Sequence, residues 1–158
     1  MRRIIKAPTT VGTLFVGVLL ASRAVGAGSP RFTVTTAGVL DAKTGLTWEQ
    51  TAPATKYSWA AAKDHCAGKL NGWRLPNIRE LQSIVDEARS PTIDPLFVLP
   101  APSQDPEPFD FWSATASMGV AGHAWFVRFG YGSSFDADKE NDPTAGDVTT
   151  AYLVRCVR

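Results

Sequence analysis

The chain of 158 residues carries 16 lysines and arginines against 15 aspartates and glutamates, which gives a formal net charge of +1. A nucleic-acid-binding protein needs a clustered basic excess, and the sequence contains no such cluster. A chain of this length forms one ordinary domain with a real core and is too short for two comfortable ones. Composition and charge therefore predict a single domain and exclude nucleic acid as the expected partner.

The first 27 residues have the layout of a secretory signal peptide, in which basic residues precede an apolar stretch that ends in small residues. The apolar centre covers residues 11–21, whereas a membrane-spanning helix needs roughly 20 residues. We expect cleavage after Ala27, with cleavage after Ala24 as the alternative. An uncleaved anchor is the competing interpretation.

The expected mature chain, residues 28–158, is a single exported domain that is periplasmic, secreted or at the cell surface, with no membrane span. Cleavage removes four basic residues and no acidic ones, so 12 basic residues remain against 15 acidic, a net charge of −3. Broad adhesion to polyanions would require a local basic patch. The sequence does not show whether Arg128, Arg155 and Arg158 form one.

Cys66 and Cys156 are the two cysteines of the chain. An even number of cysteines in an exported protein favours a disulfide. Two free thiols or a pair of metal ligands are the alternatives, although so wide a separation matches no common zinc spacing.

A β-hairpin is expected near the N-terminus of the mature chain. Residues 31–36 alternate between apolar and polar side chains, as a strand does. Two short apolar segments, residues 39–41 and 46–49, then flank a turn-forming group that includes Gly45, which readily adopts positive φ.

Two helices are predicted next. Ser58 can cap a helix that runs to about Lys69, and Asn77 followed by Glu80 resembles the capping box that starts a second helix. The buried faces are expected to hold Trp59, Ala62, Cys66 and Leu70 in the first helix, and Ile78, Leu81, Ile84 and Val85 in the second.

The second half of the chain combines a long irregular region with strands. Six prolines lie within residues 91–108, a density that prevents both regular helix and central strand. Alternating patterns predict strands at residues 109–113, 124–129 and 151–157, with the side chains of the last strand at positions 152, 154 and 156 on one face. The order of elements indicates an α+β domain with a mainly antiparallel sheet and a long irregular loop region.

Five short motifs are spread along the expected mature chain. They are T-G-L-T-W at 44–48, S-W-A-A-A-K-D-H-C at 58–66, G-W-R-L-P-N-I-R-E-L at 72–81, F-W-S-A-T at 111–115 and V-R-C-V-R at 154–158. Together they resemble the C-terminal domain family of the collagen-like adhesin Lcl, a family of bacterial exported domains. The resemblance covers the chain from about Phe32 to Arg158.

The resemblance implies a C-type-lectin-like fold, in which a cysteine on the first helix is bonded to one on the last strand. Cys66 and Cys156 occupy those two places. In that fold the long middle region usually carries the ligand site, which here corresponds to about residues 91–147. The resemblance thus predicts a non-catalytic recognition or adhesion module for a surface glycan or a protein.

Within that region, aromatic and basic side chains near the late strands are the candidate ligand contacts. An exposed aromatic ring beside an arginine can stack on a sugar or pair with a sulfate. The alternation does not decide which face of residues 124–129 is exposed, and ordinary core aromatics are the competing interpretation. The candidates are Trp112, His123, Phe126, Arg128 and Tyr131.

No cofactor and no metal site are predicted. Asp138, Glu140, Asn141 and Asp142 carry the hard oxygen ligands that calcium prefers, but their spacing matches no EF-hand loop, so a solvated acidic loop is the favoured interpretation. His65 is expected at the surface, because it lies off the apolar face of its helix.

No catalytic constellation is visible, so the expectation is that the chain is not an enzyme. A structural or assembly subunit of the cell envelope is the main alternative function. An oxidoreductase similar to the formylglycine-generating enzymes, which share the C-type-lectin-like fold, is a more distant one. That chemistry depends on an active-site cysteine pair, and a structural disulfide would use both cysteines of this chain.

Overall fold

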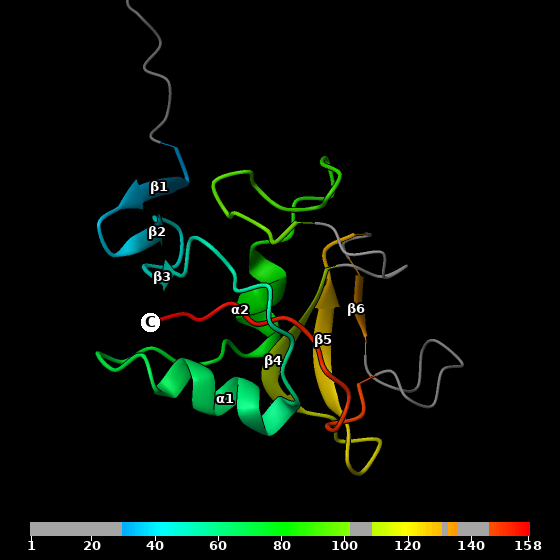
Figure 1. Cartoon of the computed structure of the whole chain (residues 1–158). Coiled ribbons are helices and arrows are strands. Elements are labelled where there is room, and N and C mark those ends of the chain that lie inside the picture. Colours follow the sequence, from blue (N-terminus) through cyan, green and yellow to red (C-terminus); the bar gives the residue numbers. More distant parts are fainter. Residues whose placement is uncertain (1–29, 102–108, 131–132, 136–145) are drawn as a thin grey trace, which may run out of the picture.

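The computed structural model describes residues 30–101, 109–130, 133–135 and 146–158. These residues form two helices and two three-stranded antiparallel sheets (Figure 1). The α+β class with two helices is therefore confirmed, while the C-type-lectin-like assignment stays a prediction. The expected signal peptide lies outside the described residues. Within them, no helix is both long and apolar enough to cross a bilayer.

The N-terminal sheet combines the predicted hairpin with the strand predicted just before it. Its strands are β1 (Phe32–Thr35), β2 (Gly38–Asp41) and β3 (Thr47–Trp48). The expected turn follows β2, and Gly45 has a φ of +74° there. The buried Asp41 carboxylate stabilises this turn, because it accepts hydrogen bonds from the backbone of Lys43 and the hydroxyl of Thr44 as well as from Arg31.

The two helices are short and lie against the C-terminal sheet. Helix α1 covers Trp59–Ala67 and packs on β4, while α2 covers Ile78–Ser83 and packs on β4 and β5. The predicted capping box of α2 is confirmed, since Asn77 accepts from the Glu80 backbone and Glu80 accepts from the Asn77 backbone. Arg74 adds two hydrogen bonds of 2.7 Å to the Glu80 carboxylate, which fixes the chain where it enters the helix.

The C-terminal sheet consists of β4 (Asp110–Ala116), β5 (Ala124–Arg128) and β6 (Ser133–Phe135). The strand predicted at residues 151–157 is not a regular strand. The segment runs between the two sheets and makes single bridges to each, as Leu153 does with Phe111 and Val157 does with Trp48 (Figure 1). It pairs with several elements in turn, so no continuous ladder forms.

Alternation along this C-terminal segment sends its side chains into two different core clusters. The predicted face of Tyr152, Val154 and Cys156 packs in cluster two. The opposite face, with Leu153 and Val157, packs in cluster one. Cluster one includes Val39, Trp48, Leu81, Ile84, Phe97, Phe111, Val127 and Phe129; cluster two includes Ala62, Cys66, Leu75, Trp112, Ala124 and Phe126.

Candidate functional site

The predicted disulfide is present between Cys66 on α1 and Cys156 in the C-terminal segment, and no free cysteine remains. The two Cα atoms are 5.4 Å apart although 90 positions separate the residues in sequence. Both cysteines are fully buried in cluster two. The bond therefore fixes the helix to the end of the chain from inside the core.

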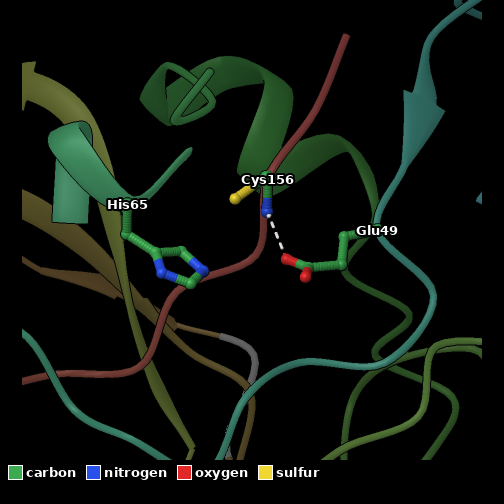
Figure 2. A group of neighbouring side chains, drawn as sticks. All are labelled: Glu49, His65 and Cys156. Carbon is green, nitrogen blue, oxygen red and sulfur yellow. Dashed lines mark hydrogen bonds between the residues drawn. The ribbon is translucent and has the colours of Figure 1, made fainter. Parts of the chain in front are cut away.

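Two polar side chains lie beside this disulfide. Figure 2 shows the imidazole of His65 and the carboxylate of Glu49 turned toward one another next to Cys156. One ligand atom from each of these three residues lies within 4.8 Å of the other two. His65 is half-buried and stacks on Tyr57, with ring centroids 4.7 Å apart, so its expected position at the surface is wrong. Its Nε2 atom is buried and has no hydrogen-bond partner among the residues that the structure describes.

Glu49 connects this cluster to the rest of the fold. Its Oε2 atom accepts a hydrogen bond of 3.1 Å from the backbone of Cys156, and its Oε1 atom lies 2.8 Å from the ammonium of Lys69. The carboxylate is thus charge-paired while one of its oxygens still faces the disulfide. No sequence motif marked Glu49, because its partners come from the end of α1 and from the C-terminus.

Three of the expected ligand contacts are interior residues, which corrects the expectation that they face a ligand. Trp112 and Phe126 have no exposed surface and pack edge to face in cluster two. Arg128 is 4% exposed, and its guanidinium donates two hydrogen bonds to the Asp110 carboxylate on the neighbouring strand. Both faces of β5 are covered, since a helix and the C-terminal segment pack around the sheet; we therefore do not retain these three side chains as ligand contacts.

The other expected site residues are not brought together with these. His123 is half-buried next to β5, where its backbone bridges to that of Asp147, and its role stays a prediction. Tyr131 and the weak calcium candidates Asp138, Glu140, Asn141 and Asp142 lie outside the described residues. Among the described residues, the cluster of Glu49, His65 and Cys156 is the one group with metal-binding side chains in reach of each other.

The described part of the proline-rich region forms a hollow of about 550 Å³. This volume falls within the range of small-ligand pockets, which are mostly apolar with a few polar groups. Val98 is 44% exposed there, although its backbone is fixed by hydrogen bonds to Gln50 and Ala52. The residues around the hollow are Arg89, Ser90, Pro91, Ile93, Pro95, Phe97, Val98 and Leu99.

A buried arginine holds one wall of this hollow in place. Arg155 is completely buried, and its guanidinium donates to the backbone carbonyls of Glu49, Gln50 and Val98 at 2.7 to 3.1 Å. The guanidinium also lies over the rings of Phe97 and Phe111. Burial lowers the pKa of Arg155 to about 10, so the side chain remains protonated at neutral pH and keeps all its donors.

The three late arginines do not form a basic surface patch, because Arg128 and Arg155 are buried. The side chain of Arg158 lies over the ring of Trp73. The sequence held a signal for the interior position of Arg155, which was missed. Arg155 alternates with Cys156, on the same face as Leu153 and Val157, so the pattern that buries these two also buries the arginine.

These features define the class of the protein: a small α+β domain with a disulfide in its core and an apolar hollow at its surface. The family model of the Lcl C-terminal domain matches residues 37–158, which is most of the chain. The chain therefore belongs to the Lcl C-terminal domain family, as its motifs indicated. No curated protein matches the sequence.

Proposed function

We propose that the chain is an exported recognition module of C-type-lectin-like fold, which binds a surface ligand through the hollow beside residues 89–99 and performs no catalysis. The observation that carries the proposal is the hollow itself, an apolar depression on a loop that backbone hydrogen bonds and Arg155 hold rigid. Loops that a rigid scaffold positions are where binding residues concentrate. The hollow also lies in the region where the family resemblance places a ligand site.

The lining of the hollow favours a protein ligand over a glycan. Its apolar side chains are aliphatic or proline apart from the ring of Phe97, which is only 1% exposed, and its one positively charged group is Arg89, at 45% side-chain exposure. An aliphatic surface suits the apolar side chains of a peptide segment, whereas sugar hydroxyls need a larger set of hydrogen-bonding groups than this lining supplies. A neighbouring envelope protein would use the same surface, so an assembly role is the second candidate.

Two further observations support export and a non-catalytic role. Membership of a family named after an adhesin, together with a core disulfide, is typical of exported proteins. Both cysteines are engaged in that disulfide, so the oxidised protein offers no thiol for chemistry of the formylglycine-generating type.

A matched pair of substitutions tests the proposed site. Val98 and Val34 have nearly equal exposure, 44% and 45%, but Val98 lines the hollow and Val34 lies on β1. We expect Val98→Asp to lower the affinity for a bound ligand by tenfold or more, because it places a charge on an apolar surface. We expect Val34→Asp to leave that affinity within about twofold.

The purified protein and both variants should be tested on an array of extracellular proteins, an array of glycans and a panel of isolated envelope proteins, with circular dichroism to confirm folding. Binding to an extracellular protein that Val98→Asp removes supports recognition, and the same result with an envelope protein supports the assembly role. Glycan binding that neither variant changes would move the site away from the hollow. A turnover activity that depends on a free thiol would contradict the binding proposal.

A further inference from the structure

The cluster of Glu49, His65 and Cys156 lies apart from the proposed hollow and has no assigned role. Its members come from three elements: the segment after β3, helix α1 and the C-terminal segment. One ligand atom of each lies within 4.8 Å of the other two (Figure 2). The sulfur of Cys66 is bonded to that of Cys156 at 2.07 Å. Folding has therefore gathered one sulfur, an imidazole and a carboxylate around one point, with a second sulfur one bond away.

This donor set matches zinc once the disulfide is opened. Thiolates are strong zinc ligands, and zinc in proteins is bound by four donors drawn from cysteine, histidine and carboxylate side chains. We propose that two-electron reduction of the Cys66–Cys156 disulfide creates a zinc site formed by both thiolates, the Nε2 atom of His65 and a carboxylate oxygen of Glu49. In the oxidised protein the sulfurs bond to each other and this site does not exist.

The chemistry balances with a dithiol as the reductant. The dithiol gives two electrons and two protons, becomes a disulfide itself, and leaves Cys66 and Cys156 as two thiols. Zinc then displaces the two thiol protons to the solvent as it binds. No other oxidant or reductant takes part, since zinc itself does not change its oxidation state.

The geometry requires a contraction around three ligand atoms and a separation of the two sulfurs. Zinc–sulfur bonds of about 2.3 Å and zinc–nitrogen bonds of about 2.0 Å place tetrahedral ligand atoms roughly 3.3 to 3.8 Å apart. The ligand atoms of Glu49, His65 and Cys156 lie within 4.8 Å of one another, and the two sulfurs move apart from their bonded distance of 2.07 Å once the disulfide is reduced. Among the described residues the buried Nε2 atom of His65 makes no hydrogen bond that a metal would have to displace. The imidazole ring also packs against the ring of Tyr57.

The charges around the cluster also suit a bound cation. Two thiolates and one carboxylate carry three negative charges, and zinc with the Lys69 ammonium supplies three positive ones. Lys69 pairs with Oε1 of Glu49, and Oε2 faces Cys156, so one oxygen can bind the metal while the other keeps its ammonium partner. Such outer partners orient metal-binding carboxylates, and neutrality removes most of the cost of burying the site.

The protein then has two alternative cross-links at one place. The disulfide ties α1 to the C-terminal segment under oxidising conditions, and zinc ties the same two elements when the cysteines are reduced. Zinc that binds the folded protein better than the unfolded chain raises its stability. The reduced protein should therefore be more stable with zinc than without it.

Metal titration of the purified protein tests the site. The protein is reduced with dithiothreitol, separated from it by anaerobic gel filtration and titrated with zinc, and with cobalt(II) as a spectroscopic substitute. We expect one metal ion per chain, a thiolate-to-cobalt charge-transfer band, visible absorption typical of tetrahedral cobalt, and a higher midpoint of thermal unfolding with zinc. The oxidised protein should show none of these. Absence of metal binding by the reduced protein, or equal binding by the oxidised one, would overturn the proposal.

Two variants distinguish zinc bound by all four ligands from zinc bound by the two thiolates alone. His65→Phe keeps a ring against Tyr57 but removes the nitrogen ligand, and Glu49→Gln keeps a hydrogen-bond acceptor but removes the charge. Each should weaken zinc binding by the reduced protein more than about tenfold, as the loss of a ligand exceeds the effect of losing an outer partner. Asp64→Asn, an exposed change on the same helix, is the control. Unchanged zinc affinity in both His65→Phe and Glu49→Gln would show that only the thiols bind, and would overturn the site.

Discussion

The two faces of the C-terminal segment are tied to the fold by different kinds of link. On the side of cluster two, Cys156 forms a covalent bond to helix α1. On the side of cluster one, the adjacent Arg155 binds three backbone carbonyls from two other segments. The disulfide joins two points of the chain, whereas Arg155 ties its own segment to two others.

The difference shows which link matters to the proposed site. Arg155 donates directly to the carbonyl of Val98, which lines the hollow, while the disulfide lies in the other cluster. The covalent bond limits the freedom of the unfolded chain, and the arginine shapes the folded one. We therefore expect loss of the disulfide to lower stability with little effect on the hollow, and loss of Arg155 to affect both.

The largest effect is expected from removal of the disulfide. Replacing Cys66 and Cys156 together by alanine should lower the free energy of unfolding by about 4 kcal/mol, because a cross-link spanning 90 positions restricts the unfolded chain strongly. Urea denaturation of the variant and of the oxidised wild type measures the difference. The reduced wild type in zinc-free buffer should lose a similar amount. A loss below about 1 kcal/mol would show that the disulfide is not the main link on this side.

The next largest effect is expected at Arg155. Arg155→Met keeps the apolar volume between Phe97 and Phe111 but removes three charge-assisted hydrogen bonds, and only the carbonyls of Gln50 and Val98 keep a backbone donor that the structure shows. We therefore expect a loss of about 3 kcal/mol. Arg155→Lys should lose less, because lysine keeps the charge but not the planar set of donors. The free energy of unfolding from urea denaturation checks both.

Arg158→Met, at the exposed end of the chain, is the control for Arg155 and should change stability by less than about 0.5 kcal/mol. Ligand affinity distinguishes the role of Arg155 from that of the disulfide more clearly than the free energy of unfolding does. The folded fraction of Arg155→Met should bind more weakly than the double cysteine variant. Equal affinity in these two proteins would mean that Arg155 does not shape the hollow.

Local signals in the sequence predicted much of the fold correctly. The hairpin turn, the capping box of Asn77 and Glu80, and the inward face of Cys156 each depend on residues within a few positions of each other. Such contacts are set by backbone geometry and side-chain periodicity, which a single sequence displays directly. The same reasoning identified both helices, whereas the pairing of the two cysteines was predicted from their even number and from the family resemblance.

Alternation along the C-terminal segment indicates the inward face of Arg155, but the partners that allow charged residues to be buried were not predictable in the same way. Arg155 is separated from its carbonyl partners on Glu49 and Gln50 by more than 100 positions, and Arg128 from Asp110 by 18. An arginine is normally exposed unless such partners meet it in the core. The candidate ligand site at Arg128 failed for this reason, and the cluster around His65 was missed because Glu49 reaches it only through tertiary packing.

A smaller effect is expected where the irregular loop meets β5. The buried Thr92 donates through its hydroxyl to the carbonyl of Phe129 at 2.7 Å. Thr92→Val keeps the shape of the side chain and removes this hydrogen bond, so the free energy of unfolding should fall by about 1 kcal/mol. Thr92→Ser, which keeps the hydroxyl and loses a methyl group, is the matched comparison. Thermal or urea unfolding that shows no loss for Thr92→Val would place the rigidity of the loop in Arg155 and in the backbone hydrogen bonds.

The smallest effect is expected at the start of α2, which neither the disulfide nor the hydrogen bonds of Arg155 join to the C-terminal segment. Glu80 accepts from Arg74 and from the backbone of Asn77, and these hydrogen bonds, the one from Arg74 above all, hold the pKa of Glu80 below its ordinary value of 4.5. The stabilisation is thus fully present above about pH 4.5 and is lost as the pH falls through the lower pKa of the folded state. Glu80→Gln should cost about 1 kcal/mol at pH 7, because it removes the charge from a partly exposed pair and weakens the cap.

The pH dependence distinguishes this electrostatic effect from a loss of packing. The difference in the free energy of unfolding between wild type and Glu80→Gln should shrink as the pH falls from 5 toward 3, because the unfolded chain then takes up a proton at Glu80 more readily than the folded protein does. Glu87→Gln, an exposed change beyond the helix, should show no comparable difference at any pH in this range. If the gap between wild type and Glu80→Gln is the same at pH 7 and pH 3, the role of Glu80 lies in the shape of the cap and not in its charge.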